Sequence, residues 1–179
     1  MPASWKDASL DAIFNPGSIA IIGASDNPRK LGHLTLRALQ SSNFPGAIHL
    51  VNPSLEPVRG QKTYSRIQDI PAQVDLALIA VQGFNVPTVL ADCAEKGVKG
   101  AVIYSSGFKE LGAPGRALED EVARIANRAH IGVIGPNCLG VGNVAKQLNA
   151  TFFPHPALIK SGGVSLVSQS GGVAGLMLY

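Results

Sequence analysis

The stretch Ser18-Ile-Ala-Ile-Ile-Gly-Ala-Ser25 predicts a buried β-strand that ends in glycine. From Leu31 onward, apolar or small residues fall at positions 31, 34, 38 and 39, which is the spacing of one helical face. Glycine lets a backbone approach a phosphate closely, and the amides at a helix N-terminus attract anions. The turn from Gly23 to Gly32 therefore predicts a phosphate or nucleotide site, with a plain tight turn as the alternative.

The alternation of strand and helix continues along the chain. Four more apolar runs predict strands, at 47–51, 76–81, 101–104 and 130–134. Two helices lie between them, one with Pro87 in its first turn and Gly97 at its end, the other entered through Pro114. The strands are apolar on both faces, which is typical of a parallel sheet covered by helices. We therefore expect a doubly wound α/β fold whose ligand lies at the carboxyl ends of the strands.

The C-terminal part of the chain has a different pattern. Asparagine, proline and glycine break the periodicity over 143–162, which we interpret as a linker with a short hairpin around 148–153. A new strand–loop–helix unit follows, with a strand at Val164-Ser-Leu-Val167 and a loop at Ser168-Gln-Ser-Gly-Gly172. We therefore assign 1–142 to one domain and 163–179 to the beginning of a second, truncated α/β domain.

The composition excludes several classes of protein. Of the 179 residues, 46% are hydrophobic and 15% are charged, which implies a large buried core and excludes disorder for most of the chain. The net charge of +3 is not gathered in a Lys/Arg run, so we expect no nucleic-acid partner. The two cysteines cannot build a disulfide framework and no zinc spacing occurs, so we expect no metal and a cytoplasmic location. Neither a signal peptide nor a membrane span is evident, so no membrane partner is expected.

Two features argue against ordinary NAD binding. Ser25 and Pro28 stand where the usual dinucleotide fingerprint has glycine. The second strand ends in Val51-Asn-Pro53, without the acidic residue that would bind a ribose diol.

Two other loops follow predicted strands. Small residues in Ser105-Ser-Gly-Phe-Lys-Glu110 would let a ligand pass close to the backbone, although a flexible loop is the alternative. In Gly135-Pro-Asn-Cys-Leu-Gly140, Cys138 could act as a nucleophile only with a nearby base or another setting that stabilises a thiolate. No neighbouring histidine supplies one, so a packed or pocket-lining thiol is favoured. We assign no catalytic residue to the chain.

The motifs also occur in a specific order over nearly the whole chain: Leu10-Asp-Ala-Ile-Phe-Asn-Pro-Gly-Ser-Ile-Ala-Ile-Ile-Gly-Ala-Ser25, Val51-Asn-Pro53, Ser106-Gly-Phe-Lys-Glu110, Gly135-Pro-Asn-Cys-Leu-Gly140, Leu148-Asn-Ala-Thr-Phe152 and Ser168-Gln-Ser-Gly171. Together they resemble the N-terminal CoA-binding domain of NDP-forming acyl-CoA synthetases. That family includes ADP-forming acetyl-CoA synthetase, which is the more similar branch, and the alpha subunit of succinyl-CoA synthetase. The resemblance implies a Rossmann-like first domain and a flavodoxin-like second one.

The resemblance implies where coenzyme A lies. The residues expected at its phosphates are Gly23, Ala24 and Ser25, and those expected at the adenosine end are Val51, Asn52 and Pro53. Val81 and Gln82 should line the pantetheine path, and Ser106 and Gly107 should lie in the loop beside CoA. Asn137 and Cys138 should lie near the thiol end. The family often has a basic residue just after the second strand. Leu55 stands in that region here, so the role falls to Arg29, Lys30 or Arg59. The residues expected to bind phosphate after the linker are Ser168, Ser170, Gly171 and Gly172.

The family reaction joins a carboxylic acid to CoA at the expense of a nucleoside triphosphate, through an acyl phosphate and a phosphohistidine. The resemblance places that histidine beyond this chain, together with the ATP-grasp part that would hold ATP or ADP and magnesium. We therefore expect the chain to be inactive alone, and to act with an ATP-grasp subunit or domain in an oligomer. The alternatives are a CoA-binding regulatory domain of a protein lysine acetyltransferase and a stand-alone CoA- or nucleotide-binding module.

Overall fold

A computed structural model describes residues 4–153 and 160–177, and most of them build one sheet with flanking helices. The sheet has six strands in the order β3-β2-β1-β4-β5-β6, and every neighbouring pair is parallel. This confirms the doubly wound α/β prediction. The strands are β1 (Ser18–Ile22), β2 (Ala47–Val51), β3 (Thr63–Tyr64), β4 (Leu76–Ile79), β5 (Gly100–Ile103) and β6 (Gly132–Ile134). Because the strand order reverses between β1 and β4, the crevice beside their carboxyl ends is where such sheets bind ligands.

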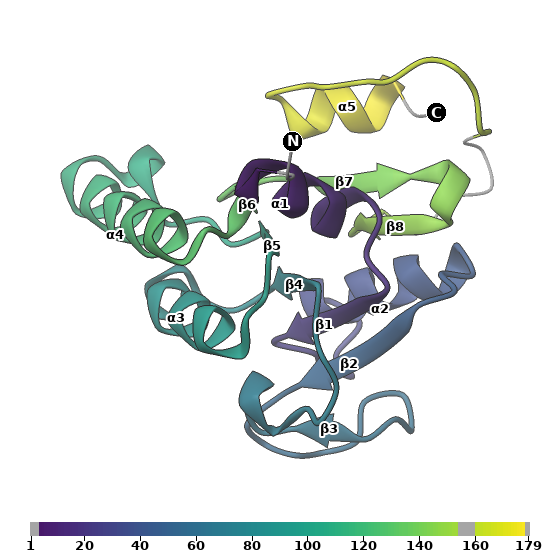
Figure 1. Cartoon of the computed structure of the whole chain (residues 1–179), viewed down its shortest axis with the longest axis horizontal. Helices are drawn as coiled ribbons and strands as arrows, with labels where there is room; N and C mark the ends of the chain where they lie inside the picture. Colours follow the sequence, from purple (N-terminus) through teal and green to yellow (C-terminus); the bar gives the residue numbers. More distant parts are fainter. Residues whose placement is uncertain (1–3, 154–159, 178–179) are drawn as a thin grey trace.

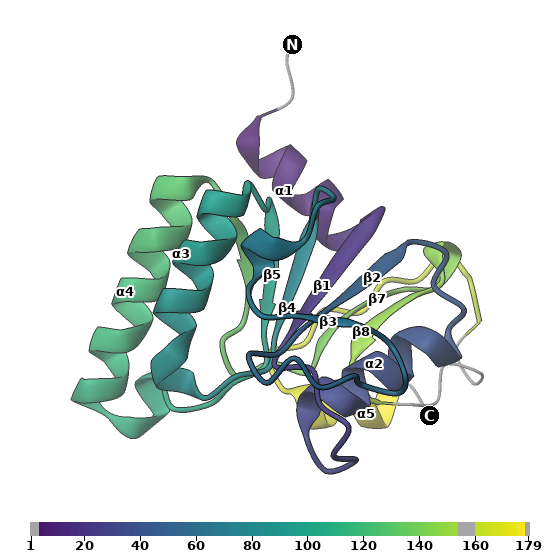
Figure 2. The ribbon, with the colours of Figure 1, turned by 90° about the horizontal axis from the view of Figure 1, so that it is seen from below.

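Helices cover both faces of the sheet (Figures 1 and 2). Two of them, α3 and α4, lie side by side on one face, whereas α2 lies on the other. The helices are α1 (Trp5–Phe14), α2 (Leu31–Ser41), α3 (Val86–Lys96), α4 (Ala113–Ala129) and α5 (Gly171–Met177). Single 3-10 turns η1 to η4 occur at Ile67–Asp69, Gly83–Asn85, Lys109–Leu111 and Val144–Lys146. In the described part of the chain, no helix is both long and apolar enough to span a bilayer.

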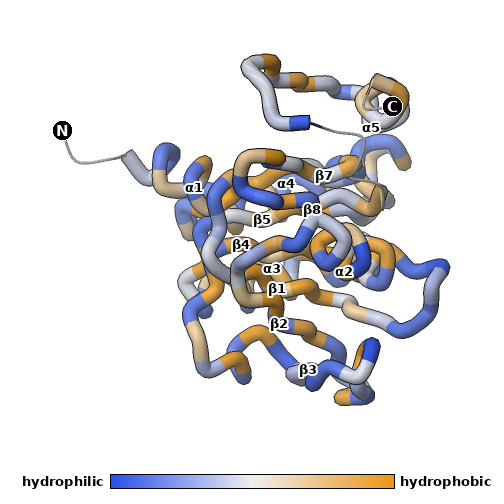
Figure 3. Tube along the Cα trace, turned by 90° about the vertical axis from the view of Figure 1, so that its right-hand side faces the viewer, coloured by the Kyte–Doolittle hydropathy of each residue, from blue (hydrophilic) through white to orange (hydrophobic). Residues whose placement is uncertain are grey.

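The core has two halves, one on each face of the sheet. Successive residues of a strand point to opposite faces, so Ile19 and Ile21 pack toward α2 while Ala20 and Ile22 pack toward α3 and α4. All four are buried. This two-sided burial explains why the strands are apolar throughout rather than alternating, as the hydropathy of the central strands shows (Figure 3).

Some element boundaries agree with the sequence and others do not: the strand expected at 76–81, for example, ends at Ile79. Pro87 lies in the first turn of α3, and Gly97 ends that helix in a left-handed conformation, as expected. The strand expected from residue 130 begins only at Gly132, because His130 takes φ of 55° and ends α4 instead. The two-residue strand β3 and the N-terminal helix α1 were not among the predicted elements.

An antiparallel hairpin of β7 (Gly140–Asn143) and β8 (Leu148–Thr151) follows β6. It packs on α2, and its Leu148 and Ala150 are buried in the same core as β1. The Tyr104 hydroxyl donates a hydrogen bond of 2.9 Å to the Ala150 carbonyl, which ties the hairpin to the end of β5. The hairpin expected around 148–153 therefore forms between 140 and 151 and packs on the first core, and 154–159 of the expected linker lie outside the described residues.

The strand expected at 164–167 is absent, so that prediction was wrong. These residues have no strand partner, and Val164 and Val167 are 94% and 96% exposed. A strand needs a neighbour to complete its hydrogen bonds, and the described residues provide none here. The helix expected after this loop does form, as α5.

Candidate functional site

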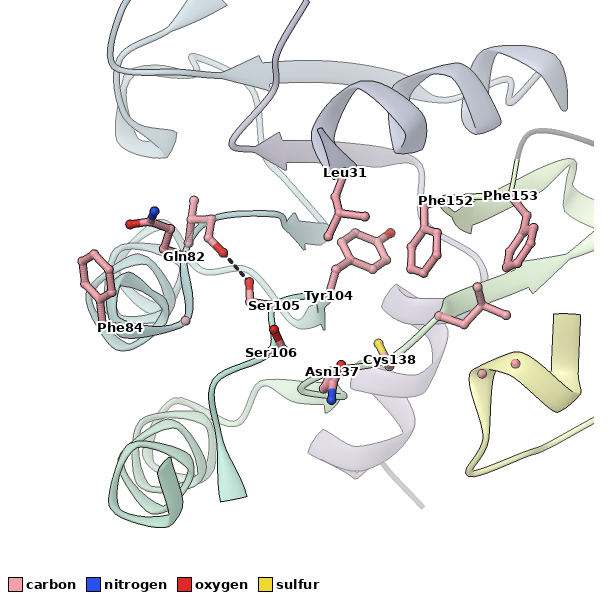
Figure 4. Close-up of a pocket in the computed structure, with 15 residues that line it drawn as sticks. Leu31, Gln82, Phe84, Tyr104, Ser105, Ser106, Asn137, Cys138, Phe152 and Phe153 are labelled. Atoms are coloured by element: carbon pink, nitrogen blue, oxygen red, sulfur yellow. Dashed lines mark hydrogen bonds between the residues drawn. The ribbon is translucent and has the colours of Figure 1, made fainter. Parts of the chain in front are cut away.

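A cavity of about 880 Å³ opens where the loops after β4, β5 and β6 meet the start of α2, the end of the hairpin and the start of α5 (Figure 4). One wall carries hydroxyl and amide groups, and the opposite wall carries aromatic side chains. Its lining residues are Leu31, Val81, Gln82, Gly83, Phe84, Tyr104, Ser105, Ser106, Asn137, Cys138, Leu139, Phe152, Phe153, Gly171 and Gly172.

A second cavity of about 280 Å³ lies beside the carboxyl ends of β1, β2 and β3 and the first turns of α3. Its lining residues are Ile22, Gly23, Val51, Pro53, Ser65, Arg66, Ile67, Val81, Asn85, Thr88, Val89 and Asp92. Val81 lines both cavities, so they adjoin at the point where the strand order reverses.

The turn after β1 is held by close backbone approaches. Gly23 has φ of +92°, and a Cβ added to it would lie 2.5 Å from the carbonyl oxygen of Ala80, the first residue after β4. A Cβ added to Gly32, in the first turn of α2, would lie 2.1 Å from the carbonyl oxygen of Gly23. Only glycine fits at either position, and the two bring the end of β1, the loop after β4 and the N-terminus of α2 together.

The backbone amides of the turn after β1 have different partners. The amides of Gly23 and Ala24 both donate to the carbonyl of Val51, at 3.0 and 3.2 Å. These two hydrogen bonds connect the end of β1 to the end of β2, so the two amides are already paired within the protein. No side chain caps the N-terminus of α2 at Lys30. The first amides of α2 are therefore the donors that this turn offers to an anion.

Asn52 has a structural role in the same region. Its Nδ2 donates 2.8 Å to the carbonyl of Ala24, and its Oδ1 accepts from the amide of Ser54 at 3.0 Å. The side chain thus joins the loops after β1 and β2. Arg29 and Lys30 are exposed and line neither cavity.

A chain of hydrogen bonds orders the loops around the larger cavity. Ser105 Oγ donates to the Val81 carbonyl at 2.5 Å, and the amide of Asn137 donates to the Ser105 carbonyl at 2.9 Å. The Glu110 carboxylate accepts from the Gly107 amide at 2.6 Å and from Asn137 Nδ2 at 3.5 Å. Backbone hydrogen bonds, the one from the Gly107 amide above all, lower the pKa of Glu110. The three loops are therefore positioned before any ligand arrives.

Cys138 lies in this cavity as a neutral thiol. Burial raises its pKa to about 11, and its Sγ lies 3.4 Å from the Ile103 carbonyl, to which it donates. A nucleophilic cysteine needs the opposite shift. The described residues also contain no group of three His, Cys, Asp or Glu side chains that could hold a metal ion.

We expect Cys138 to react with iodoacetamide about 100-fold more slowly at pH 7 than an unhindered cysteine, because so little of it is thiolate. Its rate should keep rising with pH toward the pKa of about 11. Peptide mass spectrometry separates it from Cys93, which is fully buried and serves as the internal control. Circular dichroism at each pH checks folding, and a rate that levels off below pH 8 would contradict the buried-thiol assignment.

The structure brings many of the predicted residues to these two cavities. Those lining the larger one are Val81, Gln82, Ser106, Asn137, Cys138, Gly171 and Gly172, and those lining the smaller one, besides Val81, are Gly23, Val51 and Pro53. The predicted residues that line neither are Ala24, Ser25, Arg29, Lys30, Asn52, Gly107, Ser168 and Ser170. Sequence reasoning missed the aromatic wall of Tyr104, Phe152 and Phe153, although Phe152 stands in a quoted motif. It also missed Arg66 and Asp92, because nothing in the sequence pairs a residue after β3 with one on α3.

Comparison with protein families and curated proteins gives strong matches. A family model described as a CoA binding domain matches residues 17–143. The chain is 42% identical over 170 residues to the alpha subunit of acetate–CoA ligase (ADP-forming) II of Pyrococcus furiosus, covering 95% of this chain and 36% of that protein. It is 43% identical over 176 residues to the ADP-forming acetate–CoA ligase of Methanocaldococcus jannaschii, covering 97% of this chain and 24% of that protein. The chain thus spans 36% or less of these two relatives.

Solved structures of high similarity share the fold. A crystal structure of a Pyrococcus horikoshii protein has a TM-score of 0.88 at 42% identity, covering 95% of this chain and 38% of that one. A dinucleotide-forming acetyl-coenzyme A synthetase of Ca. Korarchaeum cryptofilum, in complex with phosphate and ADP, has a TM-score of 0.88 at 40% identity. It is matched over 96% of this chain and 36% of that one.

Proposed function

This chain belongs to the CoA-binding domain family, and from that premise we propose that it is the CoA-binding part of an ADP-forming acid–CoA ligase. The observation that supports this most is the pair of adjoining cavities along the strand ends, because an extended ligand with a nucleotide at one end and a thiol at the other matches them. The relatives named as ADP-forming acetate–CoA ligases support the reaction class.

We place the adenosine in the smaller cavity, beside Gly23, Val51 and Pro53. The pyrophosphate then lies near the first amides of α2, with Ala24, Ser25, Asn52, Arg29 and Lys30 around the turn. From there the pantetheine arm enters the larger cavity past Val81, which borders both.

The polar wall of the larger cavity suits the amide-bearing arm of CoA. Val81, Gln82 and Ser106 border its path, Gly107 follows Ser106 in the same loop, and Asn137 and Cys138 lie near its thiol end. Since Cys138 is a neutral thiol, it lines the site rather than forming a covalent bond with the acyl group. The work of this chain is therefore to bind CoA and to aim its thiol.

We place the bond-forming chemistry in the rest of the enzyme. An ATP-grasp subunit or domain that binds ATP or ADP with magnesium would phosphorylate a histidine outside this chain. The phosphohistidine would pass its phosphoryl group to the carboxylic acid, and the CoA thiol would then displace phosphate from the acyl phosphate. Residues 163–179 would begin a second domain, with Ser168, Ser170, Gly171 and Gly172 as a phosphate loop. The glycines at the start of α5 face the larger cavity, where the thiol end is placed, which supports this assignment. We expect a cytoplasmic oligomer.

Isothermal titration of the chain tests the proposal. We expect a dissociation constant for CoA of about 1–100 μM, and binding of NAD and ADP at least about 10-fold weaker. NAD or ADP binding more tightly than CoA would refute it.

A blocking variant tests the path of the arm. Ser106→Phe adds a ring at an exposed position of the larger cavity and should weaken CoA binding about 10-fold or more. Ala117→Phe, which adds the same ring on the exposed face of α4, is the matched control and should leave CoA binding unchanged. Equal affinities of the two variants would rule out this path.

A further inference from the structure

The two cavities differ sharply in charge. The residues that line the larger cavity are all uncharged. Of those that line the smaller one, all of them within the described part of the chain, Arg66 and Asp92 carry charge. The cations expected to meet phosphate, Arg29, Lys30 or Arg59, line neither.

Arg66 is held at the rim of the smaller cavity from two sides. It lies two residues after the end of β3, and its amide donates 2.9 Å to the carboxylate of Asp69 in η1, which fixes the backbone. Its guanidinium donates 2.9 Å through Nη2 to Oδ1 of Asp92, on α3. The Arg66 side chain remains 58% exposed, whereas that of Asp92 is 24% exposed. The guanidinium has five N–H donors, so the bond to Asp92 leaves it able to bind an anion from solvent.

The rest of the smaller cavity suits an adenosine with a charged group at its rim. Ile22, Val51 and Ile67 give it an apolar floor, against which the face of a base can pack. Ser65 and Thr88 add hydroxyl groups near the charged pair. A planar guanidinium can form bidentate hydrogen bonds with phosphate oxygens, which makes arginine well suited to recognise a phosphate on the ribose.

Building on the proposed function, we propose that Arg66 recognises the 3′-phosphate of the CoA ribose and distinguishes CoA from dephospho-CoA. One phosphate of CoA is thereby assigned to one side chain, Arg66, which the sequence did not single out. Asp92 holds the guanidinium at the rim, which limits the side-chain entropy lost on binding.

Titration with CoA and dephospho-CoA, which differ only in the 3′-phosphate, tests the assignment. The unaltered chain should bind CoA about 30-fold more tightly, the value expected for hydrogen bonds to a charged group. Arg66→Gln should lose most of that preference by weakening CoA binding, while its affinity for dephospho-CoA stays within about 3-fold. Arg66→Lys keeps the positive charge but loses the bidentate geometry of the guanidinium, so it should retain part of the preference for CoA over dephospho-CoA.

Arg124→Gln is the matched control, because Arg124 is also an exposed arginine in an ion pair, with Glu121 on α4, and lines neither cavity. It should leave both affinities unchanged. Circular dichroism should show each variant folded, since the Arg66 side chain is exposed. If the unaltered chain binds neither ligand, the proposed function fails with this inference. If it binds both equally, or if Arg66→Gln keeps the full preference, the inference alone fails.

Discussion

Gly32→Ala is expected to lower the free energy of unfolding by about 3 kcal/mol, although alanine is the better helix former by about 1 kcal/mol. Gly32 is buried in the first turn of α2, and the added methyl would lie 2.1 Å from the carbonyl oxygen of Gly23. That neighbour is backbone, so it cannot move without displacing the turn after β1. CoA binding should weaken as well, because the same turn leads to the α2 amides. Urea denaturation measures the first effect and titration with CoA the second.

Gly142→Ala is the matched control for this substitution. Gly142 lies in β7, and its added methyl would meet the Leu148 carbonyl at 3.6 Å, an ordinary contact. The control should change stability by less than about 0.5 kcal/mol. A Gly32→Ala chain as stable as this control would show that the close approach of α2 to the turn does not exist in solution.

Phe108→Ala is expected to lower the free energy of unfolding by about 4 kcal/mol, because the substitution leaves a large hole in the core. Phe108 is fully buried against α3 and α4, although it belongs to the loop after β5. Its backbone carbonyl also lies so close to Gly115 that a Cβ there would be 1.8 Å away. The ring therefore anchors the Ser106–Gly107 segment at the rim of the larger cavity, and CoA affinity should fall with stability.

Two variants make this measurement specific. Phe108→Leu keeps most of the buried volume and should cost only about 1.5 kcal/mol. Phe84→Ala removes a ring that is 68% exposed and should change stability by less than about 0.5 kcal/mol. Thermal and urea unfolding should show the largest loss of stability for Phe108→Ala, a smaller one for Phe108→Leu and the smallest for Phe84→Ala. A small loss of stability for Phe108→Ala would contradict the anchoring role.

Much of the fold could be predicted because local patterns agreed with the sheet. Strands apolar on both faces can only be buried between helix layers, and Gly97 stops α3 where it was expected. Other features depend on contacts between distant residues. The strand β3, which was missed, is two residues long and exists through pairing with β2. The hairpin was expected around 148–153, but its bounds are set by its packing on α2 and by the bond from Tyr104 to Ala150. The strand expected at 164–167 had the right composition but no neighbour.

The residues of the candidate site also fall into those that local patterns predict and those that depend on contacts between distant parts of the chain. Residues in loops directly after strands, such as Val81, Ser106 and Asn137, came together because all parallel strands end at one edge of the sheet. Hydrogen bonds that decide which groups face a ligand could not be read from the sequence. The amides of Gly23 and Ala24 are taken by Val51, and Arg66 is placed by an ion pair with a residue 26 positions away.

The shared border at Val81 has a consequence for how a two-ended ligand binds. Each cavity alone binds only one part of the ligand, but once one end of a molecule occupies the first cavity, its other end is held close to the second. The second contact then forms at an effective concentration of the order of millimolar. Adenosine 3′,5′-bisphosphate and pantetheine added as separate molecules would therefore bind with far lower affinity than the same two parts joined in one coenzyme.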